Sequence, residues 1–108
     1  MHLPTEIFGD VLVVHAPDEL NEEHAVPFCR FLTEQGRTKI VVDLDGVESL
    51  DSAGLTSLLD AQDWCRTGRG DLKLMTSNGM NLKILEITRL DEQLEAFESV
   101  IDAVKSFA

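Results

Sequence analysis

The chain has 108 residues, of which 44% are hydrophobic, and its 20 acidic and 9 basic side chains give a formal net charge of −11. This length favours a single domain, residues 1–108, which is large enough to bury a core without disulfides or a metal. The acidic balance argues against direct nucleic-acid binding and against docking on an anionic membrane, because both surfaces carry negative charge.

The first predicted element is a β-hairpin. A short apolar segment, residues 6–8, is followed by the turn dipeptide Gly9-Asp10 and by residues 11–16, which are rich in β-branched side chains. Pro17-Asp18 is expected to end the second strand.

A helix is predicted to begin at Asn21, which can cap it, with the acidic residues Glu22 and Glu23 in its first turn. Apolar residues then recur at positions i, i+3, i+4 and i+7, which is one face of a helix; they are Ala25, Phe28, Cys29 and Leu32. Pro27 falls beyond the first turn, so the helix is expected either to be irregular there or to begin later. The helix is expected to end at Gly36.

Two apolar runs, residues 39–44 and 71–76, are predicted strands. The first has three consecutive apolar residues, which is typical of a parallel strand covered on both faces. Between the runs, an apolar stripe predicts a helix to about Arg66, and the two glycines of the Thr67–Gly70 segment follow it; the stripe consists of Leu55, Leu58, Leu59, Gln62 and Cys65.

The last third of the chain predicts a turn at residues 77–79, a short helix from Met80, a short strand at 94–97 and a final helix capped by Ser99. The final helix is expected to bury four residues, which are Val100, Ile101, Val104 and Phe107. Strands alternating with helices at this spacing predict an α/β fold with a mixed, mostly parallel sheet flanked by about four helices.

No residue pattern indicates catalysis. None of His2, His15 and His24 stands beside a serine or cysteine in a nucleophile motif, and no phosphate-binding glycine loop is present. The two cysteines, Cys29 and Cys65, form no C-x-x-C or Cys/His cluster, so no metal or cofactor is expected. The chain is therefore predicted not to be an enzyme. Without an apolar run of membrane-spanning length or a signal-like N-terminus, a cytoplasmic location is expected.

The segment Asp51-Ser52-Ala53-Gly54-Leu55 joins the first buried strand to the following helix. Serine is a preferred N-cap, and the helix dipole favours a negative charge there. An exposed hydroxyl at this end is suited to carry a phosphate, whose charge would switch a protein interface off. Ala53 and Gly54 are small enough for a partner backbone to approach. Asp43 and Asp51 would add to the repulsion or help to position a nucleotide-bound metal, and the sequence leaves both roles open.

These residues resemble the signature of STAS domains, and more narrowly that of the anti-sigma factor antagonists. The resemblance covers essentially the whole chain, with further matches at residues 77–91 and 99–104. It implies a protein that binds an anti-sigma factor, often a serine kinase, and thereby frees a sigma factor. It also implies that the kinase phosphorylates Ser52 and that a cognate phosphatase reverses this. The partner interface is then expected to comprise Asn21, Asp51, Ser52, Ala53, Gly54, Leu55 and Thr56.

One position departs from the family pattern. The family often has an aspartate where this chain has Asn21, which keeps the capping ability but loses the charge that bears on phosphorylation. An alternative within the same fold is a STAS subunit of a lipid-transport ABC complex, in which Ser52 contacts the ATPase subunit without being phosphorylated. A third hypothesis, Ser52 as an enzyme nucleophile, lacks an assignable base.

Overall fold

A five-stranded sheet forms the centre of the protein in the computed structural model, which describes all 108 residues. Its strand order is β1-β2-β4-β6-β7, with β1 antiparallel to β2 and every other neighbouring pair parallel. The strands are β1 (Thr5–Phe8), β2 (Val11–His15), β4 (Lys39–Asp43), β6 (Asp71–Met75) and β7 (Ala96–Phe97). The predicted hairpin and the mixed, mostly parallel sheet are confirmed.

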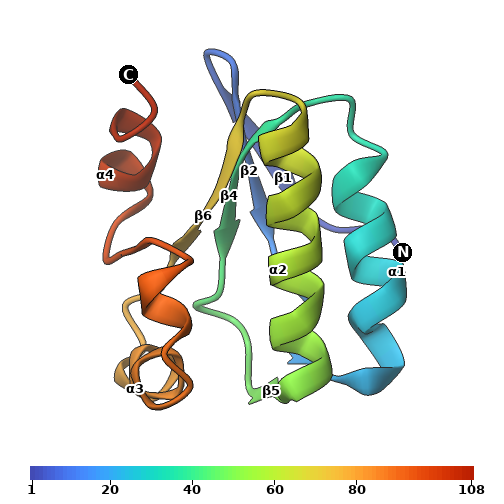
Figure 1. The fold of residues 1–108 in the computed structure, drawn as a ribbon, viewed down its shortest axis with the longest axis vertical. Coiled ribbons are helices and arrows are strands. Elements are labelled where there is room, and N and C mark those ends of the chain that lie inside the picture. Colours follow the sequence, from blue (N-terminus) through green and yellow to red (C-terminus); the bar gives the residue numbers. More distant parts are fainter.

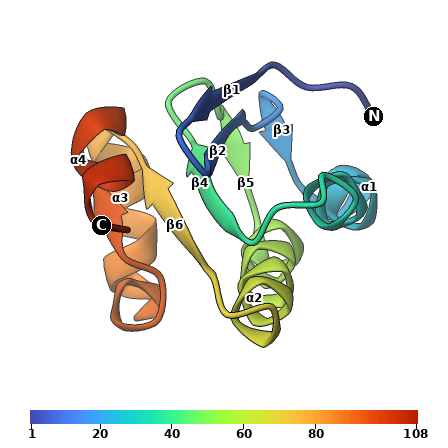
Figure 2. The same cartoon turned by 90° about the horizontal axis from the view of Figure 1, so that it is seen from above.

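Helices cover both faces of this sheet (Figures 1 and 2). α1 and α2 lie side by side on one face, α4 packs on the other, and α3 lies at the end where the parallel strands finish. The helices are α1 (Glu22–Thr33), α2 (Ser52–Thr67), α3 (Gly79–Ile87) and α4 (Val100–Lys105), with a short 3₁₀-helix η1 (Leu90–Glu92) after α3.

The central strands bury both of their faces, as the unbroken apolar run in β4 predicts. Ile40 and Val42 face α1 and α2 in the larger core cluster, whereas Val41 between them belongs to a smaller cluster under α4. This alternation follows from the two-residue period of a strand. In β2, Leu12 likewise belongs to the larger cluster and Val13 to the smaller one on the other face.

The predicted start of α1 after Asn21 is confirmed, and the helix runs on through Pro27 instead of beginning later. The proline only removes a donor to the carbonyl of Glu23, an exposed residue whose carbonyl water can reach. In α4, Ala103 is the buried residue, and Ile101 is 61% exposed, so its predicted burial was wrong. Ile101 follows Val100 by one residue and therefore points about 100° away from it around the helix.

A second, two-stranded parallel sheet was not predicted from the sequence. It pairs β3 (Glu19–Leu20) with β5 (Ser49–Leu50), the segments that lead directly into α1 and α2. Strands of two residues show no alternation that a sequence can reveal. This small sheet brings the starts of the two helices together.

Candidate functional site

The N-terminal ends of α1 and α2 meet at the end of the molecule where the parallel strands finish, at the bottom of Figure 1. In open sheets with parallel strands, ligands and partners bind at this edge. The predicted site residues Asn21 and Asp51–Thr56 lie here, at the two helix starts that β3 and β5 hold side by side. The structure therefore brings together two segments that are far apart in the chain.

Asp51 caps α2 and also accepts a hydrogen bond from the start of α1, whose own cap is Asn21. Its Oδ1 accepts a hydrogen bond from the backbone N–H of Gly54 at 2.9 Å, and its Oδ2 accepts one from the backbone N–H of Glu22 at 3.0 Å. The cap of α2 is thus Asp51, and the expectation that Ser52 caps this helix was wrong. A carboxylate has two acceptor oxygens, so it can serve two helix ends at once, which a single hydroxyl cannot do as well.

Ser52 is the first residue of α2 and is exposed. Its carbonyl oxygen accepts a hydrogen bond from Thr56 Oγ1 at 2.9 Å, which is part of the first turn of the helix. Because Ser52 is exposed, its side chain lies at the surface near the positive end of a 16-residue helix, where a phosphate is electrostatically favoured.

Gly54 and Leu55 are buried beneath this surface. A Cβ atom on Gly54 would lie 2.1 Å from the carbonyl oxygen of Leu20, so the glycine is required by the close approach of β3 to α2. The small size of Gly54 therefore allows β3 of the same chain, and not a partner, to approach α2 closely. If a partner binds here, it touches the exposed or half-buried residues Asn21, Asp51, Ser52, Ala53 and Thr56, while Gly54 and Leu55 support them from below.

A groove of about 870 Å³ runs between α1 and α2 and has Ser52 in its wall. Its lining is built mainly from small or apolar side chains, including Ala25, Val26, Cys29 and Ala53. The charged groups that line it are Glu22, Asp51 and Asp60 against the single cation Arg30. The surroundings of Ser52 are therefore concave and mostly negative.

Asp43 is held by partners of its own. Its Oδ2 lies 2.9 Å from Nδ1 of His15, whose Nε2 lies 2.8 Å from Oε1 of Glu6. Asp43 Oδ1 also accepts the backbone N–H of Asp45 at 2.9 Å. Through His15, the carboxylate of Asp43 in β4 is therefore linked to β2 and to Glu6 in β1.

Asp45 has a role that was not predicted from the sequence. Its carboxylate accepts the backbone N–H of Ser77 at 2.6 Å and the hydroxyl of the same serine at 3.1 Å. It thereby fixes the loop after β6 to the loop after β4. An isolated aspartate in a turn gives no signal from which this contact could be predicted.

The two cysteines have the features of structural residues. Burial raises the pKa of the Cys65 thiol to about 12, and the carboxylate of Asp71 adds to the effect. Burial also raises the pKa of Cys29, with Asp60 contributing. Both thiols stay protonated at neutral pH, so neither is activated as a nucleophile. No group of three or more His, Cys, Asp or Glu residues is placed to hold a metal ion, and no helix has the length and apolar character needed to cross a membrane.

The chain is similar to one protein family and to individual members of it. A sequence model of one protein family, described as the STAS domain, matches residues 2–103. A protein of Thermotoga neapolitana, provisionally named an anti-sigma factor antagonist, is 27% identical over 94% of each chain.

Two solved structures have the same fold. The crystal structure of a protein of Thermotoga maritima with the same provisional name is 26% identical, covers 97% of this chain and 93% of its own, and has a TM-score of 0.87. The Bacillus cell fate determinant SpoIIAA, solved in its phosphorylated form, is 15% identical with a TM-score of 0.70 and covers 99% of this chain and 100% of its own.

Proposed function

The chain belongs to the STAS domain family, whose members are non-catalytic, and from this premise we propose that it is an anti-sigma factor antagonist. In its unphosphorylated form it binds an anti-sigma factor that is a serine kinase, in the cytoplasm, and so frees a sigma factor. Phosphorylation of Ser52 by that kinase ends the interaction, and a cognate phosphatase restores it. The observation that carries the proposal is the exposed Ser52 at the start of α2, in the wall of the α1–α2 groove that Glu22, Asp51 and Asp60 also line.

The charges around Ser52 explain how a phosphate would act as a switch. A phosphoserine carries about 1.5 to 2 negative charges at neutral pH. It would stand beside Asp51 and Glu22, whose carboxylates already line the same groove. Burying this added charge under a partner requires its desolvation, which is costly unless the partner supplies a matching cation. The unphosphorylated surface is therefore the binding form.

Asn21 fits this scheme as a cap. Its Oδ1 accepts the backbone N–H of Glu23 at 3.1 Å, so α1 starts where the family's aspartate would start it. The missing charge makes the corner less negative, which lowers the repulsion that a phosphate on Ser52 meets. We infer that phosphorylation of this chain is thermodynamically easier than it would be with an aspartate in place of Asn21.

The proposal is tested with purified serine-kinase anti-sigma factors encoded in the source genome, titrated calorimetrically with the wild-type chain, Ser52→Ala and Ser52→Asp. Wild type and Ser52→Ala should bind one of these kinases, and Ser52→Asp should lose about two orders of magnitude in affinity, which is typical for a charge forced into an interface. Thr67→Asp, at the far end of α2, gives the same change in charge as the matched control and should bind normally.

Phosphate transfer is the second measurement. After incubation with ATP and the bound kinase, mass spectrometry should find one phosphate, on Ser52. Undiminished binding of Ser52→Asp would refute the switch. Equal binding of wild type and Ser52→Asp to a lipid-transporter ATPase, with no binding to any anti-sigma factor, would replace the proposal with the ABC-subunit alternative.

A further inference from the structure

The corner around Ser52 is too small to hold a partner by itself. A specific protein interface takes about 20 to 30 residues and about 800 Å² from each side. The exposed and half-buried members of the predicted interface are only five, which are Asn21, Asp51, Ser52, Ala53 and Thr56. A partner that binds at Ser52 must therefore cover a neighbouring surface as well.

α3 offers such a surface. Met80 and Ile87 are 73% and 71% exposed, and Ile84, half-buried, lies between them at the spacing i, i+4, i+7. The buried side of the same helix is formed by Asn81 and Leu85. A helix that is apolar on its solvent side as well as on its core side normally has a second partner. In the stripe of Met80, Ile84 and Ile87, the half-buried Ile84 also packs against the main core, and the exposed side chains of Met80 and Ile87 form the apolar face that is open to a partner.

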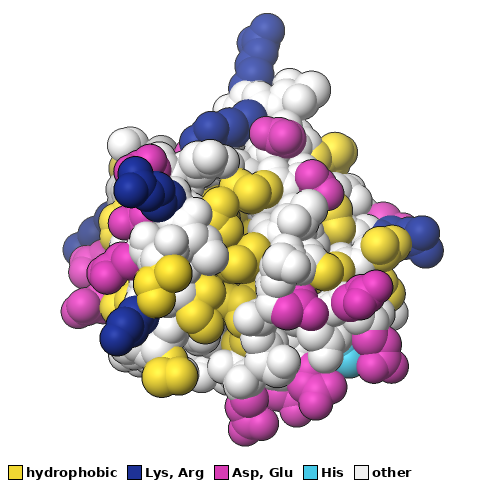
Figure 3. Space-filling model, turned by 60° about the horizontal axis from the view of Figure 1, so that its bottom comes forward, with side chains coloured by type: hydrophobic (Ala, Val, Ile, Leu, Met, Phe, Trp, Pro, Cys, Tyr) yellow, Lys and Arg dark blue, Asp and Glu magenta, His cyan; other side chains and the backbone are white.

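This stripe belongs to the same end of the molecule as Ser52. α3 and the start of α2 both lie at the bottom of Figure 1. Figure 3, which brings this end forward, shows hydrophobic side chains gathered in the middle of the face and many acidic side chains along one side of it. Methionine, which is flexible and polarisable, is common on surfaces that adapt to a partner.

We propose that the Met80–Ile84–Ile87 stripe is the second half of the anti-sigma factor interface, docking an apolar patch of the kinase that is flanked by basic residues. This inference rests on the proposed function. The charges decide against a second copy of the chain as the occupant, because each copy carries a net charge of −11 and the two would repel each other. Glu86 in α3 and Asp91 and Glu92 just after it are exposed carboxylates that a basic rim would complement.

The test uses the same purified anti-sigma kinase and a double variant, Met80→Gln with Ile87→Gln. Both side chains are exposed, so the variant should fold with an unchanged melting temperature while its affinity falls by about tenfold or more, as expected when apolar anchors are removed from an interface. The matched control is Ile7→Gln with Ile101→Gln. These isoleucines are 59% and 61% exposed on β1 and α4, and their removal should leave affinity unchanged.

The outcomes separate this inference from the proposed function. If Ser52→Asp loses binding while the Met80/Ile87 variant keeps it, the stripe is not part of the interface and the proposed function stands. If the free wild-type chain is a dimer in sedimentation experiments and the Met80/Ile87 variant is a monomer, a second copy occupies the stripe and the inference is overturned. If no anti-sigma kinase binds the wild-type chain, both fail.

Discussion

Asp51 joins two helix starts through its two carboxylate oxygens, to the N–H groups of Glu22 and Gly54. Asp51→Ala should therefore lose the cap of α2 and the acceptor for the first N–H of α1, and should destabilise the protein by about 1–3 kcal/mol, since a single cap contributes roughly 0.5–2 kcal/mol. Asp51→Asn keeps one acceptor oxygen and should fall between the alanine variant and wild type. Urea denaturation followed by circular dichroism measures all three free energies of unfolding. An asparagine variant as stable as wild type would show that only one of the two hydrogen bonds matters.

Gly54 is tied to the backbone of β3. A methyl group there would meet the carbonyl oxygen of Leu20 at 2.1 Å, so Gly54→Ala should cost about 1–3 kcal/mol through displacement of packed backbone. At Gly79, the first residue of α3, an added methyl group would have no atom within 4 Å, and Gly79→Ala should be neutral or slightly stabilising. Thermal unfolding of the two variants tests the contrast. Equal melting temperatures would mean that β3 can move away from α2 at little cost.

The elements could be predicted from the sequence to different degrees. α2 and β4 carry clear periodicity, and their place in the fold followed from it. β3 and β5 were missed because two residues cannot show a pattern, although their pairing is what sets Asp51 beside α1. The capping role was assigned to Ser52, since serine and aspartate both cap helices well and only coordinates show which side chain reaches Gly54.

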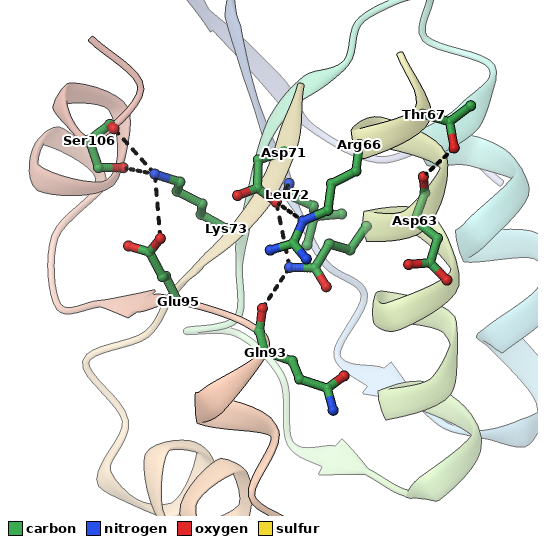
Figure 4. A network of polar contacts seen from close by, with 10 residues as sticks. Asp63, Arg66, Thr67, Asp71, Leu72, Lys73, Gln93, Glu95 and Ser106 are labelled. Carbon is green, nitrogen blue, oxygen red and sulfur yellow. Dashed lines mark hydrogen bonds and ion pairs between the residues drawn. The ribbon is translucent and has the colours of Figure 1, made fainter. Parts of the chain in front are cut away.

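One buried lysine, Lys73, links the sheet to the C-terminal end of α4. Lys73 Nζ donates to Ser106 Oγ at 2.9 Å and to the carbonyl oxygen of Ser106 at 3.2 Å (Figure 4). It also lies 4.6 Å from the centre of the Phe107 ring. Lys73→Ala should therefore release the helix locally and speed hydrogen exchange in residues 100–107. Exchange in α2, on the opposite face, should stay at the wild-type rate.

The matched control for this element is Lys83→Ala. Lys83 is exposed on α3, so its removal should change exchange in neither helix. Unchanged protection of residues 100–107 in Lys73→Ala would show that the apolar contacts of Val100, Val104 and Phe107 hold α4 without the lysine.

Across the fold, the position of Ser52 at an exposed helix start could be predicted, but its surroundings could not. The sequence places Ser52 after a strand and before an amphipathic helix. It does not show that α1 supplies the other wall of the groove, because Glu22 and Asp51 are 29 residues apart and meet only through β3 and β5. The sequence predicted a helix from the spacing of the apolar residues in α3. The same spacing occurs whether an apolar stripe is buried or exposed, so the exposure of Met80 and Ile87 could not be predicted.

Because the net charge is −11, added salt should raise the stability of the folded chain, even though it weakens the local ion pairs. Raising NaCl from 0.1 M to 1 M shortens the Debye length from about 10 Å to about 3 Å, which screens repulsion among the carboxylates of the folded chain. The melting temperature should therefore rise by a few degrees, because about 1 kcal/mol corresponds to roughly 4–8 °C for a domain of this size. The three ion pairs that lysine and arginine form, which salt weakens, work against this change but are far fewer than the carboxylates. A variant with Glu19, Glu34, Glu92 and Glu98, all exposed, changed to glutamine should show a smaller rise. If that variant gained as much stability from salt as wild type, the effect would come from ion exclusion at the apolar surface and not from the charge of the molecule.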